Sequence, residues 1–225
     1  MAKQISTGKC NLCGSTFNKQ AMTNHIDSCK QKNPVSESSS GAGPRKTKTF
    51  YLIVEGQYSP EYWMHLEIPA DATLEVLDGF LRQIWLECCG HLSAFTVEGK
   101  RYSVSPMDDF NDETMGIKLN EVLKPGMKFF HEYDFGSTTH LALKVISEQE
   151  SRIKGKSVRV LARNDPPPIL CNSCGKMATQ VCTECICNGE GWLCDQCAAE
   201  HKCGEDMLLP VVNSPRVGTC GYTGD

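Results

Sequence analysis

The middle of the chain has the alternation of apolar and polar residues that is typical of a folded domain. Residues 49–55 and 62–68 are rich in aromatic and β-branched side chains, which predicts two β-strands. After Asp71, apolar residues recur at helical spacing until Gly90, a common helix stop. They are Leu74, Leu77, Leu81, Ile84, Trp85 and Cys88. This pattern predicts one main helix after the two strands.

More strands follow the predicted helix. Residues 95–97 and 102–104 flank a turn at Glu98-Gly99-Lys100, which predicts a β-hairpin. A short helix is expected at residues 119–123 and is ended by Pro125-Gly126. Further strands are expected at residues 128–133, 141–146 and 157–162. Because strands outnumber helices and their connections vary in length, the predicted fold class is α+β with a mixed or antiparallel sheet.

Two segments have the composition of linkers. Residues 33–48 are rich in Ser, Gly and Pro and are expected to be flexible. Residues 164–169 contain three consecutive prolines, which predicts a short stiff spacer. The linkers divide the chain into three expected units: residues 1–32, 49–163 and 170–225.

The first unit carries four potential metal ligands in the pattern Cys10-x2-Cys13-x11-His25-x3-Cys29. His25 and Cys29 are four residues apart and would share one face of a short helix, opposite a turn with the two cysteines. A segment this short cannot fold on a hydrophobic core alone, whereas zinc contributes about 10–16 kcal/mol in finger peptides. The pattern resembles the Cys-Cys-His-Cys zinc fingers and predicts one zinc ion at these four residues.

The end of the chain is dense in cysteine. Nine of the fourteen cysteines lie between residues 171 and 220, and His201 lies among them. Six of the nine form three Cys-x-x-Cys pairs, Cys171/Cys174, Cys182/Cys185 and Cys194/Cys197. Each such pair places two thiolates on one metal, so the pairs with His201 and one more cysteine suffice for two closed tetrahedral zinc sites.

This spacing resembles the cross-braced zinc modules of the B-box and MYND kind. The resemblance implies that the first and third pairs share one ion, held by Cys171, Cys174, Cys194 and Cys197. It implies a second ion held by Cys182, Cys185, His201 and Cys203, with Cys220 or Cys187 as alternatives to Cys203. Together with the finger, three Zn²⁺ ions are expected. Four protein ligands leave no position open for water, so these sites are expected to be structural and not catalytic.

Two further cysteines, Cys88 and Cys89, end the predicted helix. Adjacent cysteines rarely bind one metal, and Cys88 continues the apolar face of the helix. We therefore expect Cys88 to be buried as a small hydrophobic residue.

Several short motifs of the middle unit occur in a characteristic order. They are Pro60-Glu61-Tyr62-Trp63, Ile68-Pro69-Ala70, Thr73-Leu74, His91-Leu92-Ser93-Ala94-Phe95 and Tyr133-Asp134-Phe135-Gly136. Over residues 48–160 the chain resembles the plasmid pRi ORF-three-like family, whose members are also labelled transposon-passenger or TnpR-like proteins. The resemblance implies a compact α+β domain. No serine stands in a nucleophile arrangement with arginine companions, so recombination is not expected.

Charge is distributed unevenly along the chain. Residues 1–33 carry a net charge of +4 and residues 34–48 of +2, whereas residues 49–163 and 164–225 carry −5 each. Only the first 48 residues are therefore expected to attract a phosphate backbone, through Lys19, Lys30 and Lys32. Since one finger covers only about three base pairs, contact with a protein partner is an equal alternative.

The chain has no apolar run of membrane-spanning length and no secretory signal at its start. Close cysteine pairs in such a chain favour metal binding in a reducing compartment, so a cytoplasmic location is expected. The sequence predicts a zinc-binding interaction or regulatory adaptor with no catalytic residues, whose acidic C-terminal module contacts protein. A further possibility is that zinc only replaces a missing core and that the middle domain binds a small ligand.

An enzyme is the main alternative. His91, His131, Asp134 and His140 include the residue types of a catalytic metal centre with an open position, as in a metal-dependent hydrolase or nuclease. Convergence of these four side chains would favour the enzyme. Scattered or packed positions, with Asp134 capping a turn, would favour the adaptor.

Overall fold

The computed structural model describes residues 6–32, 47–106, 112–151 and 158–224. The chain divides into two units. The first comprises Met1–Phe80 and Leu92–Asp165, and the second comprises Leu81–His91 and Pro166–Asp225. Most of the predicted linker, residues 33–46, lies outside the described residues, whereas Thr47 and Lys48 already belong to a strand.

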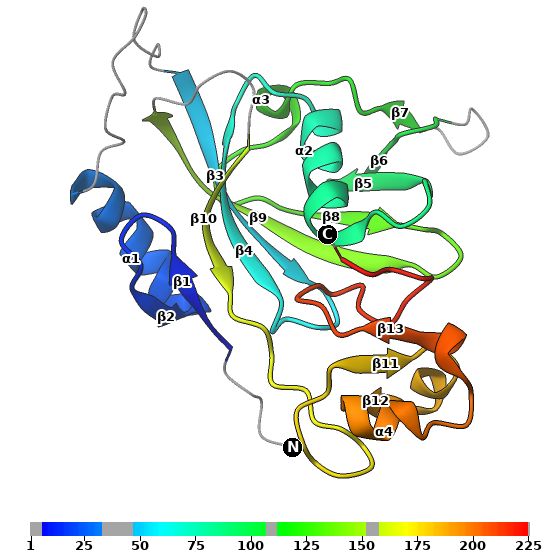
Figure 1. The fold of residues 1–225 in the computed structure, drawn as a ribbon. Coiled ribbons are helices and arrows are strands. Elements are labelled where there is room, and N and C mark those ends of the chain that lie inside the picture. The colour runs from blue at the N-terminus through cyan, green and yellow to red at the C-terminus, as the bar shows by residue number, and fades with distance from the viewer. Residues whose placement is uncertain (1–5, 33–46, 107–111, 152–157, 225) are drawn as a thin grey trace, which may run out of the picture. The chain divides into compact units, whose positions relative to one another are not determined.

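In the described part of the chain, the first unit is built on a ten-stranded sheet in the order β2-β1-β10-β4-β3-β9-β8-β5-β6-β7 (Figure 1). Neighbouring strands run antiparallel, except for the parallel pair β6 and β7. The strands are β1 (Thr7–Cys10), β2 (Thr16–Asn18), β3 (Thr47–Gly56), β4 (Trp63–Pro69), β5 (Ser93–Val97), β6 (Lys100–Ser103), β7 (Glu113–Thr114), β8 (Lys128–Tyr133), β9 (Thr139–Ser151) and β10 (Arg159–Asn164). This arrangement confirms an α+β fold with a large, mostly antiparallel sheet.

The two long strands β3 and β9 form the middle of the sheet. They pair from Thr47 opposite Ser151 to Gly56 opposite Leu141. Because β9 follows the whole of β3, it is longer than the strand predicted at residues 141–146. Each residue of β4 is buried, which is typical of a strand that is covered on both faces.

The finger is part of this sheet and not a separate unit. β1 pairs with β10, with Gly8 opposite Asn164 and Cys10 opposite Ala162. Helix α1 (Lys19–Lys32) follows β2 and lies beside β1 and β2 (Figure 1). It buries Met22 and Ile26 against the sheet. Their neighbours in this core include Tyr51, Trp63 and Leu161. The finger therefore obtains from the sheet the hydrophobic contacts that its own residues are too few to supply.

Ion pairs also connect α1 to the sheet. The carboxylate of Glu67 in β4 is fully buried, and Lys30 of α1 donates to it over 2.7 Å. Arg159 of β10 pairs with the same carboxylate, and Lys19 at the start of α1 pairs with Glu55 of β3. A buried carboxylate requires such partners because its desolvation is costly.

The helix predicted from residue 71 onward is shorter than expected. Helix α2 spans Leu74–Leu81, and a π-helical turn, η1, continues it over Arg82–Leu86. The turn closes with a hydrogen bond of 2.8 Å from the Glu87 N–H to the Arg82 carbonyl, after which the chain is extended. A one-turn helix, α3 (Leu119–Val122), follows later in the chain. With its fourteen residues, α1 of the finger is longer than α2, so the prediction of one main helix for the fold is not confirmed.

The second unit contains little regular structure. Among its described residues, strands β11 (Gln180–Cys182), β12 (Trp192–Leu193) and β13 (Leu208–Pro210) form a small sheet in the order β12-β11-β13. Helix α4 (Asp195–Ala199) and the 3₁₀ turns η3 (Cys185–Asn188) and η4 (Glu205–Met207) complete the unit. One core cluster here consists of Cys171, Cys182, Leu193, Cys194 and Ala198. Three of these five residues are cysteines, so this core needs more than apolar burial to be stable.

Candidate metal centres

Four groups of Cys and His side chains converge among the described residues. Within each group, the potential ligand atoms lie within 4.8 Å of one another. The groups are Cys10, Cys13, His25 and Cys29; Cys171, Cys174, Cys194 and Cys197; Cys182, Cys185, His201 and Cys203; and Cys88, Cys89, His91 and Cys220. Thirteen of the fourteen cysteines belong to a group, and Cys187 is the one that does not.

The spacing of the sulfur atoms fits zinc. Zinc–sulfur bonds of about 2.3 Å in a tetrahedron place two sulfurs about 3.8 Å apart. The sulfurs of Cys10 and Cys29 are 3.8 Å apart, those of Cys185 and Cys203 are 3.7 Å apart, and those of Cys174 and Cys194 are 3.5 Å apart. A disulfide needs about 2.05 Å, and the fourteen cysteines, all of them among the described residues, are thiols. The groups could therefore each hold a zinc ion.

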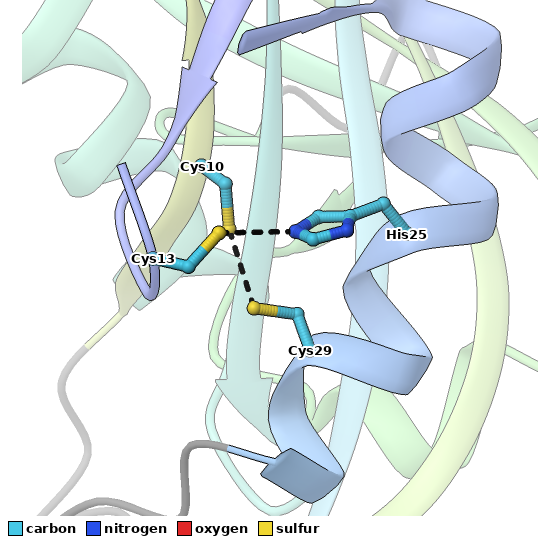
Figure 2. Close-up of side chains that lie close together, drawn as sticks. All are labelled: Cys10, Cys13, His25 and Cys29. Atoms are coloured by element: carbon cyan, nitrogen blue, oxygen red, sulfur yellow. Dashed lines mark hydrogen bonds between the residues drawn. The ribbon is translucent and has the colours of Figure 1, made fainter. Parts of the chain in front are cut away.

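The finger site lies between a strand and a helix (Figure 2). Cys10 ends β1 and Cys13 lies on the turn that follows, where the Gly14 N–H donates to the Cys10 carbonyl over 2.7 Å. His25 and Cys29 project from one face of α1, and the Asn18 side chain caps that helix by accepting from the Ala21 N–H. His25 Nε2 is 3.3 Å from the Cys13 sulfur. Local turn and helix geometry thus bring the four predicted ligands together.

Hydrogen bonds favour the ionised form of one thiol in the finger site, Cys13. The hydroxyl and backbone N–H of Ser15 lower the pKa of the Cys13 thiol to about 6. At neutral pH this thiol is therefore mostly a thiolate, which is the form that binds metal.

The first C-terminal site joins two segments. Cys171 and Cys174 flank a tight turn closed by hydrogen bonds from the Cys171 N–H to the Lys176 carbonyl and from the Gly175 N–H to the Cys171 carbonyl. Cys194 stands immediately before α4, and Cys197 lies within it. This set consists of the first and third Cys-x-x-Cys pairs, in cross-braced order.

The second C-terminal site contains the middle pair. Cys182 ends β11, and Cys185 begins the following 3₁₀ turn. His201 Nε2 lies 3.5 Å from the Cys185 sulfur, so His201 and Cys203 both reach this group despite their close spacing in the chain. Of the two alternatives to Cys203, Cys220 lies in another group and Cys187 bonds to the Thr183 carbonyl.

In the first C-terminal group, the pKa values of two thiols are shifted in opposite directions. Burial favours the neutral thiol of Cys171, but backbone N–H donors of Cys194, Cys174 and Ser173 outweigh it and lower the pKa to about 6. In the same group, hydrogen bonds with Cys174 and Cys194 raise the pKa of Cys197 to about 12. The group would therefore contain both thiolates and neutral thiols at neutral pH. A bound cation would displace the protons of the neutral thiols.

Sequence reasoning missed the fourth group. Cys88 is partly exposed and not buried as expected, and Cys89, His91 and Cys220 lie beside it. The signal in the sequence was the short run Cys88-Cys89-x-His91, which offers three ligands within four residues. The fourth ligand is more than a hundred residues away, so spacing gave no reason to add it.

The lysines proposed for nucleic-acid contact differ in their surroundings. Lys19 and Lys30 form the ion pairs with Glu55 and Glu67 described above, whereas Lys32 is exposed at the end of α1. Two of the three ammonium groups are therefore partly neutralised by carboxylates of the first unit.

The residues of the alternative catalytic centre have separate partners. His131 is fully buried, with its Nε2 2.7 Å from Asp78. His140 lies 3.4 Å from Glu132, and Asp134 accepts from the backbone N–H groups of Gly136 and Ser137 in a tight turn. His91 alone belongs to one of the four groups in the described residues.

Within the described residues, no helix combines the length and apolar character needed to cross a membrane.

Comparison with known proteins identifies a family and a solved structure to which the chain is similar. The family described as "Plasmid pRiA4b ORF-3-like protein" matches residues 53–177. No curated protein matches the chain significantly. The crystal structure of protein of unknown function MM3350 from Methanosarcina mazei Go1 is similar with a TM-score of 0.47 and 15% sequence identity, over 52% of this chain and 69% of that one.

Proposed function

The chain belongs to the plasmid pRiA4b ORF-3-like family, and we propose that this member is a non-catalytic, zinc-stabilised protein that binds a protein partner through its C-terminal module. The two C-terminal groups each offer four protein ligands, which supports a structural and not a catalytic role for a metal bound there. With four protein ligands each, a zinc ion there has no position left for water or substrate. Such zinc fixes the shape of the surface around it.

A pair of exposed apolar side chains carries the proposal. Leu170 and Met177 are 57% and 54% exposed, and two such side chains next to each other are more informative than a single exposed apolar residue. They form an isolated β-bridge across the turn that holds Cys171 and Cys174, so they lie side by side. Zinc at Cys171 and Cys174 would hold this apolar pair rigidly, and rigid contact residues lose little entropy on binding.

The charge around the apolar pair indicates the kind of partner. Thr179, two residues after Met177, donates its hydroxyl to Asp195 over 2.6 Å, which places this acidic residue of α4 near the turn. Glu184, Glu190, Glu200 and Glu205 add further exposed carboxylates to the module and outnumber its exposed lysines, Lys176 and Lys202, while its only arginine, Arg216, is fully buried. A basic segment with apolar side chains would complement this surface.

The finger has a different role in this proposal. Its lysines at positions 19 and 30 pair with carboxylates, and its helix packs on the sheet. These contacts support a function in stabilising the first unit. Contact with nucleic acid would depend chiefly on Lys32 and on the basic residues of the segment 34–48.

The test compares partner capture by three forms of the full-length protein. The double variant Leu170→Ser, Met177→Ser should fail to capture the partners that wild type captures, because the two substitutions remove the apolar contact. Tyr58→Ser is the matched control, since Tyr58 is 77% exposed and lies in the first unit, and it should capture as wild type does. Zinc content should be the same in all three proteins. An identical set of captured partners for wild type and the double variant would contradict the proposal.

A further inference from the structure

The fourth group contains three cysteines and one histidine, outside the twelve ligands that the finger and cross-brace patterns account for. The sulfur of Cys89 is 3.7 Å from that of Cys88 and 3.9 Å from that of Cys220. His91 Nε2 is 3.2 Å from the Cys220 sulfur and 2.9 Å from the Cys89 sulfur. Sulfurs about 3.8 Å apart are expected around one tetrahedral zinc ion. From this geometry we propose a fourth structural zinc site at Cys88, Cys89, His91 and Cys220.

The turn that carries three of the ligands is shaped by its own residues. After η1 the chain becomes extended at Glu87, whose carboxylate accepts from the Gly90 N–H over 2.6 Å. Gly90 has φ of +77°, a left-handed conformation that a side chain would disfavour. The chain therefore reverses between Cys89 and His91, and both side chains reach the same point.

The fourth ligand comes from a strained position. Cys220 has φ of +48°, which is unfavourable for a residue with a side chain, and Gly221 follows with φ of +68°. Strained backbone conformations of this kind persist where surrounding contacts fix them, and they are frequent at ligand sites. A bond from the Cys220 sulfur to zinc is one such contact.

A buried positive charge lies beside the site. Arg216 is fully buried, and its guanidinium donates to the Cys88 sulfur over 3.4 Å. Three thiolates and a neutral imidazole around Zn²⁺ carry a net charge of −1, which the guanidinium would balance. Hydrogen bonds from outside groups to the ligands are a regular feature of metal sites. A zinc-bound thiolate is also a better acceptor for Arg216 than a neutral thiol.

The contacts of the same segment place the tail independently of a metal. Ser214 donates its hydroxyl to the Trp85 carbonyl over 2.6 Å and accepts from the Arg216 N–H over 2.9 Å. Tyr222, close to the end of the chain, is also buried. The zinc site would thus fasten the last residues of the chain to the segment Leu81–His91, both within the second unit. It does not depend on the protein-binding function proposed above.

Native mass spectrometry of the full-length protein tests the site. Wild type should carry four zinc ions, and Cys220→Ser should carry three. Cys187→Ser is the matched control because Cys187 lies outside all four groups, and it should retain four. Three ions in wild type, or four in Cys220→Ser, would overturn the proposal and would leave the other three sites unaffected.

A second pair of variants covers the case in which Cys220→Ser fails to fold. His91→Cys keeps a zinc-binding set of four ligands and should retain four ions, whereas His91→Ala should retain three. In parallel, carboxypeptidase should digest the tail of His91→Ala faster than that of His91→Cys. Equal zinc counts for the two His91 variants would refute the site.

Discussion

His65 in β4 is a buried histidine that is not in a metal group. Its Nδ1 is 2.6 Å from the Tyr51 hydroxyl, and its Nε2 has no hydrogen-bond partner among the described residues. Burial, aided by the positive charge of Lys19, lowers the pKa of His65 to about 3. The folded protein therefore keeps this imidazole neutral at pH values where the unfolded chain, with a pKa of about 6.5, takes up a proton.

Stability should consequently decrease as the pH falls from about 6.5 towards 3. In this range the unfolded state binds one proton more at His65, at a cost of about 1.4 kcal/mol per pH unit. Between pH 7 and pH 5, we expect His65→Gln to lose about 2 kcal/mol less unfolding free energy than wild type, because glutamine does not titrate. Urea unfolding at the two pH values measures the difference, and protonation of other groups cancels in the comparison. Equal losses would show that His65 already titrates normally in the folded state.

The pairing of β1 with β10 decides whether the finger belongs to the sheet. Gly8 of β1 faces Asn164, and a Cβ atom at this position would lie 2.2 Å from the Arg163 carbonyl oxygen and 2.7 Å from the Trp63 ring. Because the nearest atom is backbone, the clash cannot be relieved by a change of rotamer. Close approach of the two strands therefore requires glycine here.

Gly8→Ala should separate β1 from its neighbour and destabilise the protein by about 1–3 kcal/mol, the usual cost of overpacking. The backbone amide of Asn11, which bonds to the Leu161 carbonyl, should exchange its hydrogen faster. Gly79→Ala is the control, since Gly79 lies in α2 with no atom within 4 Å of the added carbon. There alanine should stabilise the helix by about 0.8–1 kcal/mol. If hydrogen exchange at Asn11 is as slow in Gly8→Ala as in wild type, the strand pairing is wrong.

At the scale of the whole molecule, the two units differ in what stabilises them. The first unit has a large apolar core that includes Trp63, Tyr51 and Phe129. A cluster at the centre of the second unit is made largely of potential zinc ligands. When ligands take the place of a core, metal binding supplies much of the folding energy.

Removal of zinc with a high-affinity chelator should therefore unfold the C-terminal module and leave the large sheet folded. Trypsin should then cleave rapidly after Lys176 and Lys202, which lie next to the ligands Cys174, His201 and Cys203. Addition of zinc should restore resistance. Unchanged cleavage at these two lysines after verified metal loss would contradict a structural role for the metal.

Local spacing explains how much could be predicted. The two cysteines of each Cys-x-x-Cys pair are close in sequence, so a tight turn alone brings them together. The strands and the helix of the middle domain follow from short apolar patterns. The partners of Lys30, Glu67 and Cys220 could not be predicted, because each depends on segments that are distant in the chain. No periodicity links Cys220 to Cys89.

By itself, the sequence determined the α+β class and most elements of the middle domain. Its resemblance to known zinc modules implied three sets of four potential zinc ligands, with Cys220 and Cys187 left as alternatives to Cys203. These properties arise from interactions between residues that are near one another in the chain. The tertiary structure decided that the finger is built into the ten-stranded sheet, that Lys19 and Lys30 pair with carboxylates, and that Cys88, Cys89, His91 and Cys220 meet. The reason is physical: strand pairing, burial of charge and convergence of distant ligands are settled only when the whole chain has folded.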